Sequence, residues 1–142
     1  MRLELFNTRD RRVQTIVRRL QKDLERDLGR PGRISIVLSG DRLVRELNRR
    51  FLDRDRPTDV LAFPTEARSS KFLGEVYVCR DQARRQARDY EVEYYDEISR
   101  LVLHGVLHLL GLTHRQMEPY YQRYLSRKSD VQSRRSKVRE RP

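Results

Sequence analysis

The chain has 142 residues, a formal net charge of +11 at pH 7 and a single cysteine. This length suits one compact domain and excludes two independent domains of ordinary size. The lone Cys79 excludes an intramolecular disulfide framework, agrees with a reducing compartment, and is expected to be buried in a strand. Because residues 1–6 lack the apolar stretch of a secretory signal and no run is long enough to span a membrane, the sequence predicts a soluble, cytoplasmic protein.

The excess of positive charge predicts a polyanionic partner, with nucleic acid as the first candidate. The sequence pI is about 10.5. Arginine provides most of the cations and suits bidentate contacts with phosphate and stacking on bases; lysine occurs only at Lys22, Lys71, Lys128 and Lys137. Since a genome rich in G and C also raises the arginine content, the charge suggests RNA binding without deciding it.

The first half of the chain alternates predicted strands and helices. Leu3 and Leu5 mark a short first strand, and apolar residues at helical spacing then predict a helix that ends at residues 29–32, Gly-Arg-Pro-Gly. The β-branched run at 34–38 predicts a central strand. The turn after it leads into a helix that carries Leu43, Val44, Leu47 and Phe51. This alternation is typical of an α/β fold.

Two further strands and a polar helix follow. A short apolar strand lies between Pro57 and Pro64, and the bounding prolines favour a place at the edge of the sheet. Residues 73–79 alternate in polarity as a second strand, and we expect the two to pair as a hairpin with a long loop. A polar helix is predicted over 81–90, and Asp96 is expected to be the N-cap of the helix after it.

That next helix is apolar nearly all round and is expected to be the buried centre of the domain. A last amphipathic helix is predicted after it, and the helical spacing of its tyrosines favours core packing over base stacking: Met117, Tyr120, Tyr121, Tyr124 and Leu125. We therefore predict a single compact α/β domain over residues 1–127, with a mixed sheet of about four strands and a basic, mobile tail over 128–142.

All three histidines fall within residues 104–114. His104 and His108 are four residues apart and share one face of a helix. Gly111 lies one turn later, where a left-handed glycine commonly ends a helix, so the chain can turn there and bring His114 back. Three neutral imidazoles can hold a divalent ion and leave a fourth position open to water, as in catalytic zinc sites. The alternative is a chance cluster of hydrogen-bonded histidines.

The spacing of this window matches the H-E-x-x-H-x-x-G-x-x-H pattern of metzincin peptidases, except that Gly105 replaces the glutamate that acts as general base. Amide hydrolysis would lack its proton acceptor, which disfavours a peptidase. At a phosphodiester, a metal can polarise the phosphoryl oxygen and cations can stabilise the developing charge without that glutamate. The window and the basic composition together favour phosphodiester chemistry.

Three segments resemble the YbeY endoribonucleases of bacteria and organelles. Residues 104–114 are similar to the signature H-G-x-L-H-L-x-G-Y/F-D-H, residues 57–64 to P-T-D/N-V-L-S-F-P, and residues 73–76 to L-G-D-I. The resemblance implies a mixed α/β fold with a central metal helix and zinc held by His104, His108 and His114. It also implies a single-strand-specific endoribonuclease that matures the 3′ end of 16S ribosomal RNA and serves quality control of the ribosome, with the small ribosomal subunit as a partner.

The chain departs from the family pattern beside these motifs. The family usually has an arginine five residues before the P-T pair, where this chain has Leu52, so the resemblance assigns no catalytic arginine. Arg50 and Arg54 flank the position and are candidates. Asp59 is a third catalytic candidate, although capping a turn or pairing with an arginine is favoured for it. Thr113 replaces the usual aspartate before the third histidine and removes a carboxylate that could orient a ligand.

We therefore predict a zinc-dependent endoribonuclease acting on single-stranded ribosomal RNA, with nickel, copper or iron as alternatives to zinc. Two other functions stay open. The first is a basic, ribosome-associated RNA-binding factor whose metal is structural, and the second, less favoured, is a metallopeptidase whose base comes from outside the helix. The sequence leaves the oligomeric state undetermined.

Overall fold

The computed structural model describes residues 1–54, 58–66 and 71–125. Within these residues, four strands form one sheet in the order β1-β2-β4-β3: β1 (Arg2–Phe6), β2 (Arg33–Ser39), β3 (Val60–Pro64) and β4 (Phe72–Cys79). Strands β1, β2 and β4 are parallel, whereas β3 runs antiparallel to β4. The mixed sheet, the central place of β2, the edge position of β3 and the hairpin of β3 with β4 are confirmed.

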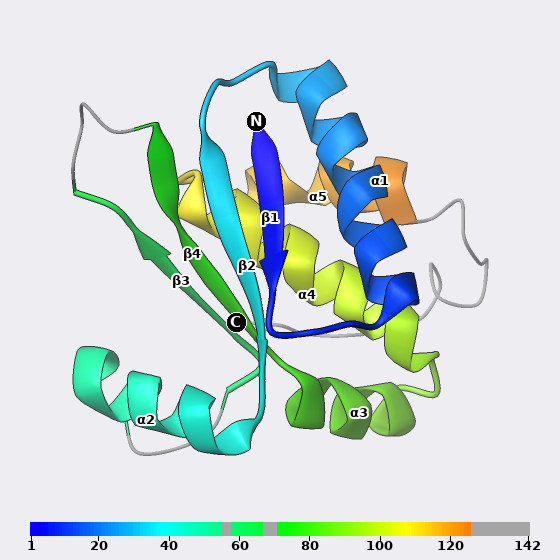
Figure 1. Ribbon diagram of the computed structural model, residues 1–142. Helices are drawn as coiled ribbons and strands as arrows, with labels where there is room; N and C mark the ends of the chain where they lie inside the picture. The colour runs from blue at the N-terminus through cyan, green and yellow to red at the C-terminus, as the bar shows by residue number, and fades with distance from the viewer. Residues whose placement is uncertain (55–57, 67–70, 126–142) are drawn as a thin grey trace.

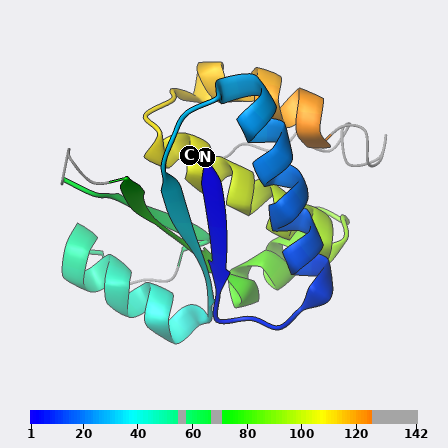
Figure 2. The same ribbon diagram turned by 45° about the horizontal axis from the view of Figure 1, so that its top comes forward.

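Five helices flank the sheet in the described part of the chain (Figure 1): α1 (Arg11–Leu28), α2 (Asp41–Leu52), α3 (Arg80–Asp89), α4 (Tyr94–Leu109) and α5 (His114–Leu125). Helix α4 crosses one face of the sheet, and α1 and α5 pack against it from outside. Helix α2 lies on the other face, over β3 and β4. The turned view in Figure 2 shows α4 enclosed between the sheet and these outer helices.

Strand β4 shows how alternating side chains separate the two faces of the sheet. Val76 and Val78 are fully buried in the main core with α4, whereas Tyr77 and Cys79 belong to the smaller cluster under α2. The apolar α4 residues that are completely buried are Ile98, Leu101, Val102, Leu103, Val106 and Leu107. Since a buried aliphatic side chain contributes about 1.5–3 kcal/mol, α4 is the main source of apolar stabilisation, as predicted for the central helix.

The start of α4 differs from the prediction. Asp96 is not the N-cap, because the helix begins earlier, at Tyr94, with Glu93 as the N-cap and Asp96 in the first turn. The hydroxyl of Tyr95 donates a hydrogen bond of 2.7 Å to Asp10, just before α1. This contact between distant parts of the chain favours a helical first turn around Tyr95, and Asp96 then interacts favourably with the positive end of the helix dipole.

Helix α2 is covered less completely than its apolar residues suggest. Val44 is fully buried, but Leu43 and Phe51 remain 42% and 60% exposed. The ring of Phe51 meets that of Phe63 on β3 edge-on, with centroids 5.5 Å apart. The sheet therefore covers only one side of the helix.

Two predictions fall outside the described residues. They are the tail at 128–142 and the proline at position 57, and the domain boundary at residue 127 therefore stays a prediction. No helix in the described ranges is both long enough and apolar enough to cross a membrane.

Candidate metal centre

The three histidines lie where α4 ends and α5 begins. The rings of His104 and His108 stack one turn apart, with centroids separated by 6.1 Å and planes inclined by 6°. Gly111 follows the end of α4 with a φ of 88°, and its N–H donates a 2.9 Å hydrogen bond to the carbonyl of His108. The chain turns at this glycine and places the ring centroid of His114 5.9 Å from that of His104. The structure thus brings together the three histidines, which we call the histidine cluster.

Thr113 fixes the first turn of α5, which begins with His114. The N–H of Gln116 donates to the hydroxyl oxygen of Thr113 at 3.2 Å, and the N–H of Thr113 donates to the side-chain oxygen of Gln116 at 2.8 Å. This reciprocal pair is a capping box. Thr113 therefore helps to position His114, and aspartate at the same place is an equally good cap.

Tyr121 on α5 orients His104. Its hydroxyl lies 2.6 Å from Nδ1 of His104 and donates a weaker, 3.6 Å hydrogen bond to the sulfur of Met117. In the tautomer that protonates Nδ1, the Tyr121 oxygen accepts this proton, and Nε2 then carries the lone pair that a metal needs. The guanidinium of Arg100 lies 4.8 Å from the centre of the Tyr121 ring and packs over it.

The histidine cluster has the donor set of a divalent transition-metal site, three imidazoles. His104 is half-buried, whereas His108 and His114 are exposed and free to rotate. Three imidazoles on a tetrahedral ion, with metal–nitrogen distances of about 2.0–2.1 Å, have ring centres roughly 5 Å apart. The observed spacings of 6.1 and 5.9 Å are longer, so the rings would have to move toward one another to share an ion.

Gly105 lies where α4 comes closest to the sheet. A Cβ atom at this position would lie 2.4 Å from Cγ1 of Val76 and 2.9 Å from Cγ2 of Val60. Both valines are held in strands, so neither can give way easily, and the helix needs a residue without a side chain here. Packing against the sheet thus requires the glycine that replaces the peptidase glutamate.

The other candidate catalytic residues lie on α2, just after α2 and just before β3. Arg50 belongs to α2, on the face of the sheet opposite α4, with its guanidinium 5.7 Å from the ring of Phe51. Arg54 is exposed after the end of α2, and Asp59 is partly buried, with its carbonyl accepting a 2.8 Å bond from the N–H of Cys79. Nothing in these contacts joins Arg50, Arg54 or Asp59 to the histidine cluster, and their catalytic roles stay predictions.

A second group of ligand-type side chains was not predicted. The ligand atoms of Asp41, Cys79 and Asp81 all lie within 4.8 Å of one another, where β4 ends and α2 and α3 begin. We call this group the Asp–Cys cluster. The thiol of Cys79 donates to Asp41 at 3.2 Å, and Asp81 accepts a 2.9 Å bond from the N–H of Asp41. Arg85 donates to both carboxylate oxygens of Asp41, at 3.0 and 2.7 Å.

The protonation states of the Asp–Cys cluster favour a structural role. The hydrogen bonds from Arg85 lower the pKa of Asp41, because they stabilise the charged carboxylate. Burial raises the pKa of Cys79 to about 11, so its thiol stays protonated at neutral pH. The thiolate, and not the thiol, is the metal ligand. The predicted burial of Cys79 in a strand is confirmed, since it is the fully buried last residue of β4.

Tyr121 is the site residue that sequence reasoning missed. Its spacing along α5 resembles that of Tyr120 and Tyr124, and all three are predicted to pack in the core. All three do so: Tyr124 is 1% exposed and its hydroxyl donates a 2.6 Å bond to Asp27, and Tyr120 and Tyr121 pack partly buried against the main core. No signal in the sequence separates Tyr121 from its neighbours, because its contact with His104 depends on the angle at which α5 returns to α4.

Comparison with known proteins gives consistent matches. The family described as "Endoribonuclease YbeY" matches residues 4–131. The protein of that name from Geobacter metallireducens is 35% identical over 123 residues, which cover 80% of this chain and 81% of that protein. The one from Persephonella marina is 38% identical over 102 residues, 69% of this chain and 67% of the relative. The one from Aquifex aeolicus is 42% identical over 83 residues, 57% of this chain and only 55% of the relative.

A solved structure has the same fold. The solution structure of TM1509 from Thermotoga maritima matches with a TM-score of 0.66 at 25% identity. The match covers 97% of this chain and 93% of that chain. This likeness over nearly the whole length of both chains confirms the predicted α/β fold.

Proposed function

Because this chain belongs to the YbeY family, we propose that it is a metal-dependent endoribonuclease that cleaves single-stranded RNA. The observation that carries the proposal is the histidine cluster, in which the turn at Gly111 brings three imidazoles together. We further propose the ribosomal substrate and partner that the family resemblance implies, namely the 3′ end of 16S ribosomal RNA and the small ribosomal subunit.

The residues of the chain prepare this site for a metal and for a phosphodiester. His104, His108 and His114 would hold the ion, with zinc as the proposed metal. A bound ion would supply Lewis acidity toward the phosphodiester. Tyr121 contacts Nδ1 of His104 and would orient its ring, and Thr113 caps the helix that carries His114. Two exposed imidazoles keep the site open to a substrate as large as RNA.

The charge of the chain favours a polyanionic substrate. The net charge of +11 draws RNA to the surface through contacts with its phosphates, and this attraction weakens as salt increases. Gly105 disfavours the peptidase alternative, since the close packing at this position leaves no room for a helix-borne glutamate.

One observation favours a second candidate, an RNA-binding factor with a structural metal. Leu52, 47% exposed, stands where the family usually has an arginine, and Arg50 lies on the other face of the sheet from α4. In this alternative the histidines hold a metal and the protein binds RNA without cleaving it.

A paired assay of the wild type and His114→Ala separates these functions. We expect the wild-type protein as purified to carry close to one zinc or similar ion and to cleave an end-labelled single-stranded RNA, with cleavage lost on chelation. His114→Ala, purified in the same way, should lose both the metal and the cleavage, which also excludes a contaminating ribonuclease. RNA that is bound but left intact by the metal-loaded wild type would instead establish the binding factor. A folded wild type free of metal would contradict both.

A further inference from the structure

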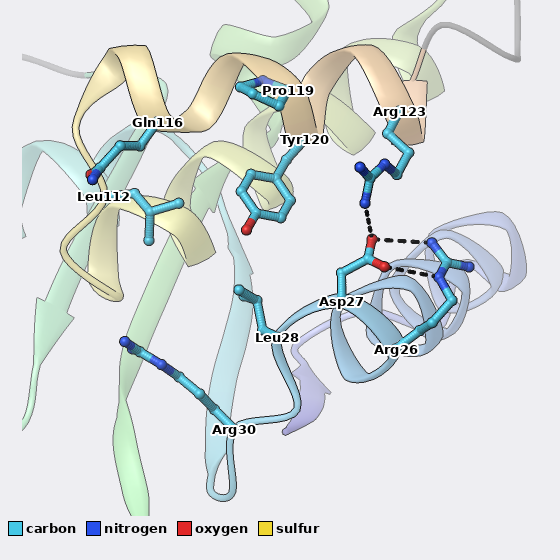
Figure 3. A pocket seen from close by; sticks show the side chains of 9 residues that line it. All are labelled: Arg26, Asp27, Leu28, Arg30, Leu112, Gln116, Pro119, Tyr120 and Arg123. Atoms are coloured by element: carbon cyan, nitrogen blue, oxygen red, sulfur yellow. Dashed lines mark hydrogen bonds and ion pairs between the residues drawn. The ribbon is translucent and has the colours of Figure 1, made fainter.

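A pocket of about 550 Å³ lies between the C-terminal end of α1 and α5, beside the loop that joins α4 to α5 (Figure 3). Its apolar part includes Leu28, Leu112 and Tyr120. The ring of Tyr120 points from α5 toward Leu28 and is held from behind by Tyr124, edge-on, with ring centroids 5.8 Å apart. The pocket is large enough for a nucleotide, and a fixed aromatic ring is a common stacking partner for an unpaired base.

Arginines flank this apolar part on two sides. Figure 3 shows Arg30 extended below Leu28 on one side, and Arg26 with Arg123 on the other. Arg26 and Arg123 share the carboxylate of Asp27, at 3.0 and 2.9 Å, which holds both guanidinium groups in place. Arg30 forms no ion pair in the described part of the chain. Arg26 also pairs with Asp23 at 3.4 Å, so three guanidinium groups face two carboxylates and the rim keeps an excess of positive charge.

The pocket adjoins the histidine cluster through the connection between α4 and α5. Leu112 and Gln116 both line the pocket, and His114 lies between them in the chain, at the start of α5. The capping box between Thr113 and Gln116 fixes this connection. Pro119 lines both this pocket and the neighbouring hollow that His114 lines, so a strand that leaves the pocket across the first turn of α5 would reach His114.

We propose that this pocket binds a nucleotide of a single-stranded RNA, with its base against Tyr120 and the neighbouring phosphates on Arg30 and on the Arg26–Arg123 pair. The identification of that RNA as the substrate rests on the proposed function. An apolar, aromatic floor between two basic sides fits one base flanked by two phosphates. An acidic peptide would use the arginines and leave the aromatic floor without a role. A duplex keeps its bases paired and stacked inside, so it has no unpaired base to place against Tyr120.

The test measures the binding of a fluorescent, 2′-O-methylated single-stranded RNA by anisotropy over a range of salt, with the integrity of the RNA checked on a gel. Arg30→Gln should weaken binding about fivefold and lower the slope of log affinity against log salt by about 0.7, the value for one phosphate contact on a single strand. The matched control, Arg88→Gln, removes an exposed arginine from the last turn of α3 and should change the affinity less than about twofold.

A second variant probes the stacked base. Tyr120→Leu should weaken binding about fivefold or more and leave the salt slope unchanged, because stacking involves no counterion release. Thermal unfolding of each variant shows whether the fold is kept, and the exposed Arg30 keeps the proposal testable if Tyr120→Leu is unfolded.

The outcomes separate this proposal from the proposed function. Equal RNA affinities of Arg30→Gln and Arg88→Gln would overturn the proposal that the pocket binds RNA, whatever RNA the wild type cleaves. A folded Tyr120→Leu that binds like the wild type would also overturn it, as would tighter binding of a glutamate-rich peptide at the same residues. A selective loss in Arg30→Gln and Tyr120→Leu would establish the pocket even if the wild type cleaves nothing, in which case only the proposed enzyme fails.

Discussion

The histidine cluster and the Asp–Cys cluster both gather side chains that can bind metals, and they differ in how strongly other residues already engage those side chains. The ligand atoms of Asp41, Cys79 and Asp81 are close together, but Arg85, the thiol proton and a backbone N–H already engage them. In the histidine cluster, Tyr121 contacts Nδ1 of His104, and the other two imidazoles are exposed. Ligand-type atoms that lie close together therefore do not by themselves identify a metal site, because other partners can already engage them.

The largest effect is expected from removing one ligand in each cluster. His108→Ala should lower metal affinity by more than about 100-fold, since even residues that only orient a ligand contribute about 10–100-fold. Asp81→Asn should keep the wild-type metal content, because Asp81 serves as a hydrogen-bond acceptor. Elemental analysis and titration against a chelator measure both. If Asp81→Asn lost the metal and His108→Ala kept it, the metal site would be the Asp–Cys cluster and not the histidine cluster.

The next largest effect should come from Tyr121→Phe. The variant keeps the ring and removes the hydroxyl that contacts Nδ1 of His104, and we expect a loss of about 10–100-fold in metal affinity. Tyr120→Phe is the matched control, because it removes the neighbouring hydroxyl on the same helix and should leave metal affinity unchanged. Chelator competition measures both, and equal affinities in the two variants would rule out an orienting role for Tyr121.

Thr113→Ala tests the cap that positions His114. Loss of the capping box should lower the free energy of unfolding by about 1 kcal/mol, whereas Thr113→Asp should stay within a few tenths, since aspartate also caps helices well. Urea unfolding of the metal-free proteins measures the difference. A Thr113→Ala protein as stable as the wild type would show that α5 starts without this cap.

The smallest effect is expected from Arg85→Gln in the Asp–Cys cluster. The side chains of Arg85 and Asp41 are 40% and 39% exposed, so screening by solvent limits the ion pair to about 1 kcal/mol or less. Because Arg85 lowers the pKa of folded Asp41, this stabilisation is present above the unfolded pKa of about 3.9 and is lost as the pH falls through the folded pKa.

Unfolding of the wild type and Arg85→Gln at neutral and at strongly acidic pH measures this pH dependence. The two proteins should differ at pH 7 and converge in acid. A difference that grows as the pH falls would contradict the assigned role of Asp41. Metal content should be the same in both proteins at pH 7.

Local patterns predicted most of the elements because each depends on neighbours in the chain. The first helix ends at Gly29, in the left-handed conformation, and strand β2 includes the whole β-branched run at 34–38. Long-range contacts escaped prediction. The insertion of β4 between β2 and β3 leaves no mark in the periodicity, and the early start of α4 involves the bond from Tyr95 to Asp10.

The same distinction applies to the site. The spacing of His104 and His108 and the glycine at 111 were sufficient to predict that the three rings would gather, because one helix and one turn determine their places. Tyr121 reaches His104 from a different helix, and Arg85 reaches Asp41 across 44 positions of the chain. Contacts between separate elements depend on how those elements pack, which residue spacing does not record.

The close approach of α4 to the sheet at Gly105 also limits how this site could change. A glutamate there would have its first side-chain carbon inside the contact distances of Val76 and Val60, well before its carboxylate could reach the histidines. A single substitution therefore cannot supply the base that a metzincin uses. Smaller residues would be needed at both valine positions, or α4 would have to move away from the strands. Either change would weaken the packing of α4 in the core. For this fold to become a peptidase of that kind, the packing between α4 and the sheet would have to change first, before a glutamate at position 105 could take part in catalysis.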